Sequence, residues 1–229
     1  MTEYFSHETA IIDAGATIGS GTKVWHFAHV FSGAVIGENC SFGQNTMVAN
    51  DVTIGSNVKV QNNVAIYSGT KIEDDVFLGP SCVLTNVSNP RSQVVRRGIY
   101  EETLMKRGAT IGANATIVCG ITVGRYSFVA AGAVVTKSIP DYAMVAGVPA
   151  KQVGWMSRHG HKLTFEQHKP AICPESKLRY KLSVVDGRKT VVCVDIDEDQ
   201  SLPNDLSIGK QGYQQFRASR NNNQLKTEN

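Results

Sequence analysis

The chain has 229 residues, with 23 lysines and arginines against 20 aspartates and glutamates, for a formal net charge of +3. This length fits one main domain with a small appendage, and so weak a charge does not favour nucleic acid or a membrane surface as a partner. No apolar run is long enough to span a bilayer and the first residues lack a secretion signal, so we expect a soluble cytoplasmic protein.

A six-residue repeat dominates the first two thirds of the chain. An apolar residue recurs at every sixth position from Ile12 to Leu84; the phase then breaks, and the same spacing resumes from Ile111 to Val135. A helix cannot keep such a repeat on one face, whereas short strands joined by tight corners can. Three hexads close one triangular coil, and stacked coils pair as parallel strands about 4.8 Å apart. The sequence therefore predicts an all-β parallel β-helix of about six coils over residues 1–152.

A long gap interrupts the repeat between Leu84 and Ile111. We expect a protruding loop over residues 85–108, which is basic through Arg91, Arg96, Arg97, Lys106 and Arg107. Two readings stand side by side: a solvated loop that packs on a neighbouring subunit, or a clamp over an anionic substrate or cofactor.

Residues eighteen apart stack one coil above another, so the repeat can be read as columns. Single asparagines in these columns fit corner positions of left-handed backbone or hydrogen-bond ladders. Columns of polar residues that run up to the base of the loop also fit a wall for a hydroxyl- and amide-rich ligand, such as a nucleotide sugar. The columns are His26, Gln44 and Asn62; Phe27, Asn45, Asn63 and Ser81; and Ser32, Asn50, Ser68 and Asn86, with Tyr67 beside the last.

Histidines and cysteines give no metal signal. His26 and His29 lie three apart, but His7, His159, His161 and His168 fall at the ends of the chain, away from these coils, so we predict no metal site. Five cysteines are an odd number and lie far apart, which predicts free buried thiols: Cys40, Cys82, Cys119, Cys173 and Cys193.

The repeats are absent beyond about residue 165. Residues 177–194 alternate around Asp186-Gly187, which predicts a β-hairpin. We expect a helix and this hairpin in an appendage over residues 153–216, and a disordered polar tail over residues 217–229.

Two strings near the end of the repeat resemble a known family. The segment Ala130–Lys137, followed by Ile139-Pro140 and then residues 145–151 (VAGVPAK), is similar to the terminal-coil signature of hexapeptide-repeat acyltransferases. The resemblance implies a left-handed β-helix, a homotrimer with sites between neighbouring prisms, and acetyl-CoA as cosubstrate. It further implies that pantetheine lies against small residues while polar ones meet the adenine and phosphates: Ala113 and Ala131 in the first role, and Thr136, Lys137 and Lys151 in the second.

Several shorter stretches together resemble one subgroup, the bacterial N-acetyltransferases that act on UDP-2-acetamido-3-amino-2,3-dideoxy-glucuronate for O-antigen and lipopolysaccharide. They are residues 25–26, 61–64, 73–77, 85–91 and 154–157. The implied reaction is direct attack of the sugar's C3 amine on the thioester, with Asn86 holding the amine. The leaving thiolate or a water could take the surplus proton, and His26 is the candidate if a side-chain base exists. The implied substrate contacts are Gln44, Asn62, Asn63, Tyr67 and Arg91.

The sequence departs from the family pattern at two places, and alternative functions stay open. Asn89 stands where galactoside- and maltose-type acetyltransferases carry a catalytic histidine, which disfavours O-acetylation. The zinc ribbon of some relatives would fall on residues 157–159 and 173–176, where most ligands are missing, so we predict a metal-free remnant. The alternatives are a dTDP-linked 3-amino-deoxyhexose as substrate and, in another class, a non-catalytic β-helix scaffold or a metal hydratase.

Overall fold

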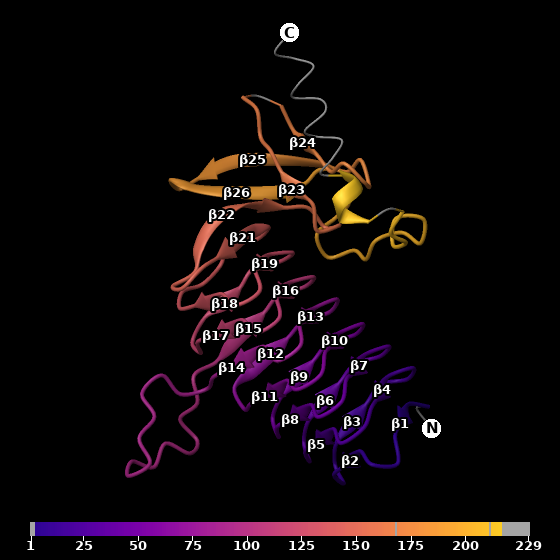
Figure 1. Ribbon diagram of the computed structural model, residues 1–229, viewed down its shortest axis with the longest axis vertical. Helices are drawn as coiled ribbons and strands as arrows, with labels where there is room; N and C mark the ends of the chain where they lie inside the picture. Colours follow the sequence, from indigo (N-terminus) through magenta and orange to yellow (C-terminus); the bar gives the residue numbers. More distant parts are fainter. Residues whose placement is uncertain (1–2, 168, 211, 217–229) are drawn as a thin grey trace. The chain divides into compact units, whose positions relative to one another are not determined.

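The computed structural model describes residues 3–167, 169–210 and 212–216, which fall into two compact units, Met1–Gly154 and Trp155–Asn229. The first unit is a left-handed parallel β-helix of very short strands (Figure 1). The register is eighteen residues per coil, as in the pairs of Lys23 with Ser41 and of Ser41 with Lys59. Within the described residues, no helix is long and apolar enough to cross a membrane.

The strands of this unit form the three faces of a prism. The first face contains β1 (Phe5–Ser6), β4 (Lys23–Val24), β7 (Ser41–Phe42), β10 (Lys59–Val60), β13 (Phe77–Leu78), β16 (Thr110–Ile111), β19 (Phe128–Val129) and β21 (Ala143–Ala146). The second contains β2 (Ile11–Ile12), β5 (His29–Val30), β8 (Met47–Val48), β11 (Ala65–Ile66), β14 (Val83–Leu84), β17 (Thr116–Ile117) and β20 (Val134–Val135). The third contains β3 (Thr17–Ile18), β6 (Val35–Ile36), β9 (Thr53–Ile54), β12 (Thr70–Ile72), β15 (Thr103–Met105) and β18 (Thr122–Val123).

The predicted inward positions form the core of the prism. In each two-residue strand the second side chain points inward, and from Ile18 to Leu84 every sixth residue is at most 4% exposed. Phe42 and Leu78 are fully buried, so the interior is filled by side chains. The prediction of a hexapeptide β-helix is confirmed.

The corners between strands account for five of the nine asparagines in the first unit. Asn39, Asn45, Asn57, Asn63 and Asn114 all have positive φ, between 55° and 61°. Asparagine tolerates this left-handed conformation better than bulky residues do. The corner reading of the asparagine columns therefore holds for these positions.

The protruding loop is shorter than the sequence predicts. Strand β15, within the range assigned to the loop, pairs in parallel with both β12 and β18 and belongs to the third face. Met105 stands six residues before Ile111, so it belongs to the same repeat as the later hexads. The predicted repeat did not include it because methionine is a weak marker of an inward position. The excursion therefore lies between β14 and β15, where the ribbon leaves the coils (Figure 1).

Two of the predicted loop cations consequently lie on a coil. The backbone N–H of Arg107 donates to Glu73 (2.8 Å), and its guanidinium contacts Asp75 (2.7 Å) and Asp74 (2.5 Å). Arg107 is thus neutralised at the corner between the third and first faces, where Lys106 also lies. The number of coils also exceeds the expected six: the first face has eight strands, because β1 and β21 lie outside the counted hexads.

The second unit is mainly antiparallel. In it Trp155 and Met156 of β22 (Lys151–Met156) pair with β23 (Lys162–Leu163), and β24 (Ala171–Ile172), β25 (Arg179–Val185) and β26 (Arg188–Cys193) form a small sheet. The predicted hairpin at Asp186-Gly187 is confirmed, since β25 and β26 pair from Tyr180 with Cys193 to Val185 with Arg188. The expected helix is reduced to one turn over residues 213–216 within the described part, and the tail at 217–229 lies outside it.

The positions aligned with a zinc ribbon make hydrogen bonds instead. The Ser157 hydroxyl donates to the Cys173 sulfur (3.3 Å), and His159 Nε2 contacts the Leu206 carbonyl (2.6 Å). All five cysteines are free, as predicted, and four are buried; burial raises the pKa of the Cys82 thiol to about 12.

Candidate functional site

The predicted site residues lie on two different edges of the prism. The first edge comprises the turns between the first and second faces: residues 7–10, 25–28, 43–46, 61–64, 79–82, 112–115 and 130–133. The second edge comprises the turns between the second and third faces: residues 13–16, 31–34, 49–52, 67–69, 85–102, 118–121 and 136–138. His26, Gln44 and Asn62 belong to the first edge, whereas Tyr67 and Asn86 belong to the second. One chain therefore does not bring these two sets together.

The first edge contains a groove of about 330 Å³. Its lining gathers three predicted residues with their neighbours: Trp25, His26, Ser41, Gly43, Gln44, Val60, Gln61 and Asn62. The Asn62 side-chain oxygen accepts a hydrogen bond from the Gln44 backbone N–H (2.9 Å), and a Cβ at Gly43 would come within 2.4 Å of that oxygen. Asn62 is thus fixed, and its amide NH₂ is the group left to donate to a ligand.

Asn63 has a structural role at this edge. Its backbone is left-handed (φ 61°), and its side-chain oxygen accepts a hydrogen bond from the side-chain NH₂ of Asn45 on the coil below (3.1 Å). The ladder uses part of the polar capacity that the sequence assigned to substrate.

His26 stacks on His7, which corrects the expectation that His7 lies away from these coils. Their ring centroids are 3.5 Å apart with an interplanar angle of 26°. His7 belongs to the β-helix because β1 pairs with β4. The repeat pattern did not predict this coil because its inward position, at the open end of the prism, is occupied by the polar Ser6.

The base of the loop on the second edge is closed by Asn86 and Glu101. The Glu101 backbone N–H donates to the Asn86 carbonyl (3.0 Å). The Glu101 carboxylate accepts from both the backbone N–H and the hydroxyl of Ser88, at 2.8 Å each. These bonds, the backbone one first, favour the ionised carboxylate and lower the pKa of Glu101. Sequence reasoning missed Glu101 because no repeat relates it to Ser88.

Two of the loop cations, Arg91 and Arg96, contact their own loop, and Arg97 is exposed. Arg91 donates to the Pro90 carbonyl (3.4 Å), and Arg96 Nε donates to the Asn89 carbonyl (3.1 Å). Tyr67 is 42% exposed on the same edge. Arg91 also lines a shallow cavity of about 330 Å³ confined to the loop, together with Val87, Pro90, Ser92, Val94 and Arg96.

The predicted cofactor residues also divide between the edges. Ala113 and Ala131 lie on the first edge, one and two coils above Ser81, while the exposed Thr136 and Lys137 lie on the second edge. Lys151 is exposed at the start of β22. From the N-terminal coils (bottom) to the C-terminal coils (top), the side chains of the first edge thus change from large polar ones to small ones.

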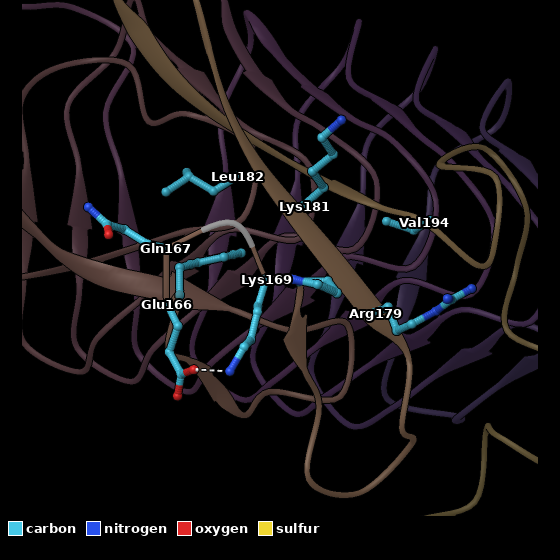
Figure 2. A pocket seen from close by; sticks show the side chains of 9 residues that line it. Glu166, Gln167, Lys169, Arg179, Lys181, Leu182 and Val194 are labelled. Carbon is cyan, nitrogen blue, oxygen red and sulfur yellow. Dashed lines mark hydrogen bonds and ion pairs between the residues drawn. The ribbon is translucent and has the colours of Figure 1, made fainter.

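A further cavity lies in the second unit and holds none of the predicted residues. It measures about 590 Å³ and is lined by Phe165, Glu166, Gln167, Lys169, Pro170, Arg179, Lys181, Leu182 and Val194 (Figure 2). Two of its cations are paired, Lys169 with Glu166 (3.2 Å) and Arg179 with Asp195 (2.6 Å). Across the described ranges, no three histidine, cysteine or acidic side chains gather in a way that could hold a metal.

Comparisons with known proteins match the repeats. The family described as bacterial transferase hexapeptide (six repeats) matches residues 15–50 and 51–86, and the hexapeptide repeat of succinyl-transferase matches residues 33–68 and 107–137. The dTDP-3-amino-3,6-dideoxy-alpha-D-galactopyranose 3-N-acetyltransferase of Aneurinibacillus thermoaerophilus is 44% identical over 177 residues, 77% of this chain and 90% of that protein. A 2,3,4,5-tetrahydropyridine-2,6-dicarboxylate N-acetyltransferase of Staphylococcus aureus (strain JH9) is 39% identical over 79 residues, 34% of this chain and 30% of that protein.

Among solved structures, PerB from Caulobacter crescentus in complex with CoA and GDP-perosamine is similar with 21% identity and a TM-score of 0.44. The similarity covers 67% of this chain and 58% of that one, so the chain spans less than two thirds of it. Fold and repeats together define a transferase built on a hexapeptide β-helix. The chain belongs to the bacterial hexapeptide-repeat transferases and is an acyltransferase.

The clamp at Glu101 gives a prediction for the loop. Because the folded pKa lies below the ordinary value of 4.5, the clamp contributes fully above that value and is lost as pH falls through the lowered pKa. Glu101→Gln should loosen the loop at neutral pH and speed hydrogen exchange of the Ser88 amide about tenfold or more. Glu102→Gln is the matched control, since Glu102 is exposed and pairs with Lys71 on the surface. Unchanged protection in Glu101→Gln would contradict the role of the clamp.

Proposed function

We propose that the protein transfers an acetyl group from acetyl-CoA to the amine of a nucleotide-linked amino sugar, and that this sugar is a dTDP-linked 3-amino-deoxyhexose. One observation carries the proposal: the first edge changes from His26, Gln44 and Asn62 below to Ala113 and Ala131 above. The lower part suits a hydroxyl- and phosphate-bearing acceptor, and the upper part suits a thin pantetheine chain against the backbone. The relative of known activity, 44% identical, acts on such a dTDP-linked sugar.

The coil on which Asn86 lies supports this division of the first edge into an acceptor part and a pantetheine part. Ser81 on the first edge and Asn86 on the second belong to the same coil, between the polar and the small part of the first edge. An acceptor rising from Gln44 and a thioester descending from Ala113 would meet at this level. Asn86 is therefore our candidate for holding the amine in line with the thioester carbonyl.

The choice of sugar rests on the loop. A uronate carries a carboxylate that a free cation would have to meet, but Arg107 is neutralised by Asp74 and Asp75, and Lys106 lies on a coil. Arg91 and Arg96 donate to carbonyls of the loop itself. Apart from the exposed Arg97, the loop cations are thus engaged, and the supply of cations for a carboxylate is smaller than the sequence implied. This favours the deoxyhexose over the UDP-linked 3-amino-uronate, which stays the alternative substrate.

In the proposed reaction the neutral amine attacks the thioester carbonyl, forming the C–N bond and a tetrahedral oxyanion. A backbone N–H would stabilise that oxyanion. The intermediate then collapses, the C–S bond breaks, and the leaving thiolate takes the proton released by nitrogen. This balance requires no side-chain base, so His26, which stacks on His7 three coils below the level of Ser81 and Asn86, is not needed in that role.

A homotrimer would complete the site. The outward positions of the second face carry no lysine, arginine or acidic residue: Ile11, His29, Met47, Ala65, Val83, Thr116 and Val134. Three copies with this face toward a common axis would bring the first edge of each against the second edge of the next. Rotation about an axis parallel to the stack keeps every coil at its height, so Asn86 of one copy comes level with Ser81 of its neighbour.

Thiol release from acetyl-CoA tests the reaction. We expect turnover with a dTDP-linked 3-amino-6-deoxyhexose to exceed that with a UDP-linked 3-amino-uronate at least tenfold in kcat/KM. The control is the same sugar already acetylated on nitrogen, which should release no thiol. Preference for the uronate would overturn the choice of sugar, and no thiol release with any amino sugar would overturn the reaction.

Asn86→Ala tests the positioning of the amine. We expect kcat to fall on the order of 100-fold because the attacking nitrogen loses its alignment, while the KM for acetyl-CoA changes less than about threefold. Asn50→Ala, two coils below on the same edge, is the matched control and should keep most of the activity. Wild-type kcat in Asn86→Ala would remove Asn86 from the mechanism.

Two valines test the trimer. Val83 on the second face and Val35 on the third are 48% and 46% exposed in one chain. We expect Val83→Glu to dissociate the protein and abolish activity because it buries a charge at the interface, whereas Val35→Glu should stay trimeric and active. Light scattering after gel filtration measures both. A trimeric Val83→Glu would show that another face lies at the axis.

A further inference from the structure

We infer that Trp25, His26 and Phe27, at the lower end of the first edge, form the platform on which the pyrimidine base of the nucleotide sugar stacks. The inference rests on the proposed function for the remainder of the ligand. It gives the base half of that ligand a binding site of its own, three coils below the reacting amine.

These three consecutive residues expose an unusual amount of aromatic surface. Trp25 is 37% exposed and Phe27 is 59% exposed, and His26 is exposed as well. The rings of Trp25 and His26 are almost parallel, with an interplanar angle of 7° and centroids 6.4 Å apart. Both residues line the groove that also contains Gln44 and Asn62. The Phe27 ring is tilted by 55° to that of His26, so it flanks the near-parallel pair. Two near-parallel rings with a third at their side, opening into a polar groove, suit a planar heterocycle joined to a polar chain.

Backbone strain at Phe27 points to a ligand independently. Phe27 has a φ of 56°, in a column otherwise filled by Asn45, Asn63 and Ser81. A bulky side chain is disfavoured in this left-handed conformation. Tyr126 and Tyr142 adopt it too, but they are 7% and 1% exposed and stack on each other at 5.2 Å, so burial offsets the strain. Phe27 stays 59% exposed and its ring meets that of His26 only at a tilt of 55° and 6.3 Å, so burial does not offset its strain and a stacked base would.

The platform is held in place before any ligand arrives. The Phe27 backbone N–H donates to the Thr9 hydroxyl oxygen (3.2 Å), and the Thr9 backbone N–H donates to His7 Nδ1 (3.2 Å). Because Nδ1 accepts, the proton of neutral His7 lies on Nε2. His7 then packs against His26 at 3.5 Å and restricts the tilt of that ring. A rigid aromatic surface loses little entropy on binding.

The separation along the prism matches the ligand. His26 lies three coils below Ser81 on the same edge, which is about 14 Å at the spacing of parallel strands. A ribose and a diphosphate have to bridge a similar gap between the base and the sugar ring. The groove between them is lined by Gln44, Gln61 and Asn62 and by no carboxylate, so nothing in its lining repels a diphosphate.

Tryptophan fluorescence tests the platform directly, because the chain has two tryptophans, Trp25 and Trp155. In a full-length Trp155→Phe background, dTDP should quench the emission of Trp25 saturably. Ribose 5-phosphate and pyrophosphate, which lack the base, should not. Absence of quenching by dTDP would overturn the inference.

Substitutions at Trp25 and Phe27 separate a loss of stacking on the base from a loss of folded structure. Trp25→Ala should raise the Kd for dTDP about 10- to 100-fold, while Trp25→Phe, which keeps a flat ring, should change it less than about fivefold. Phe27→Asn should move stability and binding in opposite directions: a higher Tm because the strain is relieved, and a higher Kd for dTDP. An unchanged Kd in Trp25→Ala, or a Phe27→Asn variant that binds as tightly as wild type, would overturn the platform.

The outcomes also separate this inference from the proposed function. Turnover of a dTDP-linked amino sugar with an unchanged KM in Trp25→Ala would leave the reaction standing and reject the platform. Saturable quenching by dTDP without turnover of any nucleotide-linked amino sugar would support the platform and reject the reaction.

Discussion

The whole first unit depends on one contact, the parallel backbone pairing of each coil with the next, which joins residues eighteen apart except across the loop and at the last coil. Each coil hydrogen-bonds to the coils above and below, so every side chain is repeated at the same place on the prism at a fixed height. Inward positions merge into one continuous core and outward positions merge into columns. A functional side chain here is described by two coordinates, its edge and its coil, and the site follows from reading the two together.

This regularity decides how much the sequence could predict. The fold followed from the apolar residue at every sixth position, because each one is buried by the same pairing. The in-phase hexad at Met105 was missed because methionine is a weak marker of an inward position, although its thioether fills the core fully. The lowest coil was missed because Ser6 needs no burial at an open end. Both errors come from the side chain at the repeat position and not from the repeat.

The site was harder to predict because its residues meet through contacts that have no period. The polar columns were identified correctly as stacks, but membership of a column does not say whether a carboxamide faces solvent or, like Asn62, accepts a hydrogen bond from a neighbouring backbone. The Ser88–Glu101 clamp crosses the loop, and the His7–His26 stack joins two aromatic rings from adjacent coils. Such pairs depend on the rotamers and loop closure of this chain, which periodicity does not encode.

Because every coil has the same height, distances along the first edge change only in steps of one coil. Inserting or deleting one complete eighteen-residue repeat below Ser81 would keep every face and every inward position, yet would shift the aromatic end by about 4.8 Å relative to the acyl end. The span between the two ends of an acceptor is thus set by a whole number of repeats. A β-helix of this kind can adapt to a longer or shorter acceptor by gaining or losing a repeat, without redesign of the chemistry that we propose at Asn86.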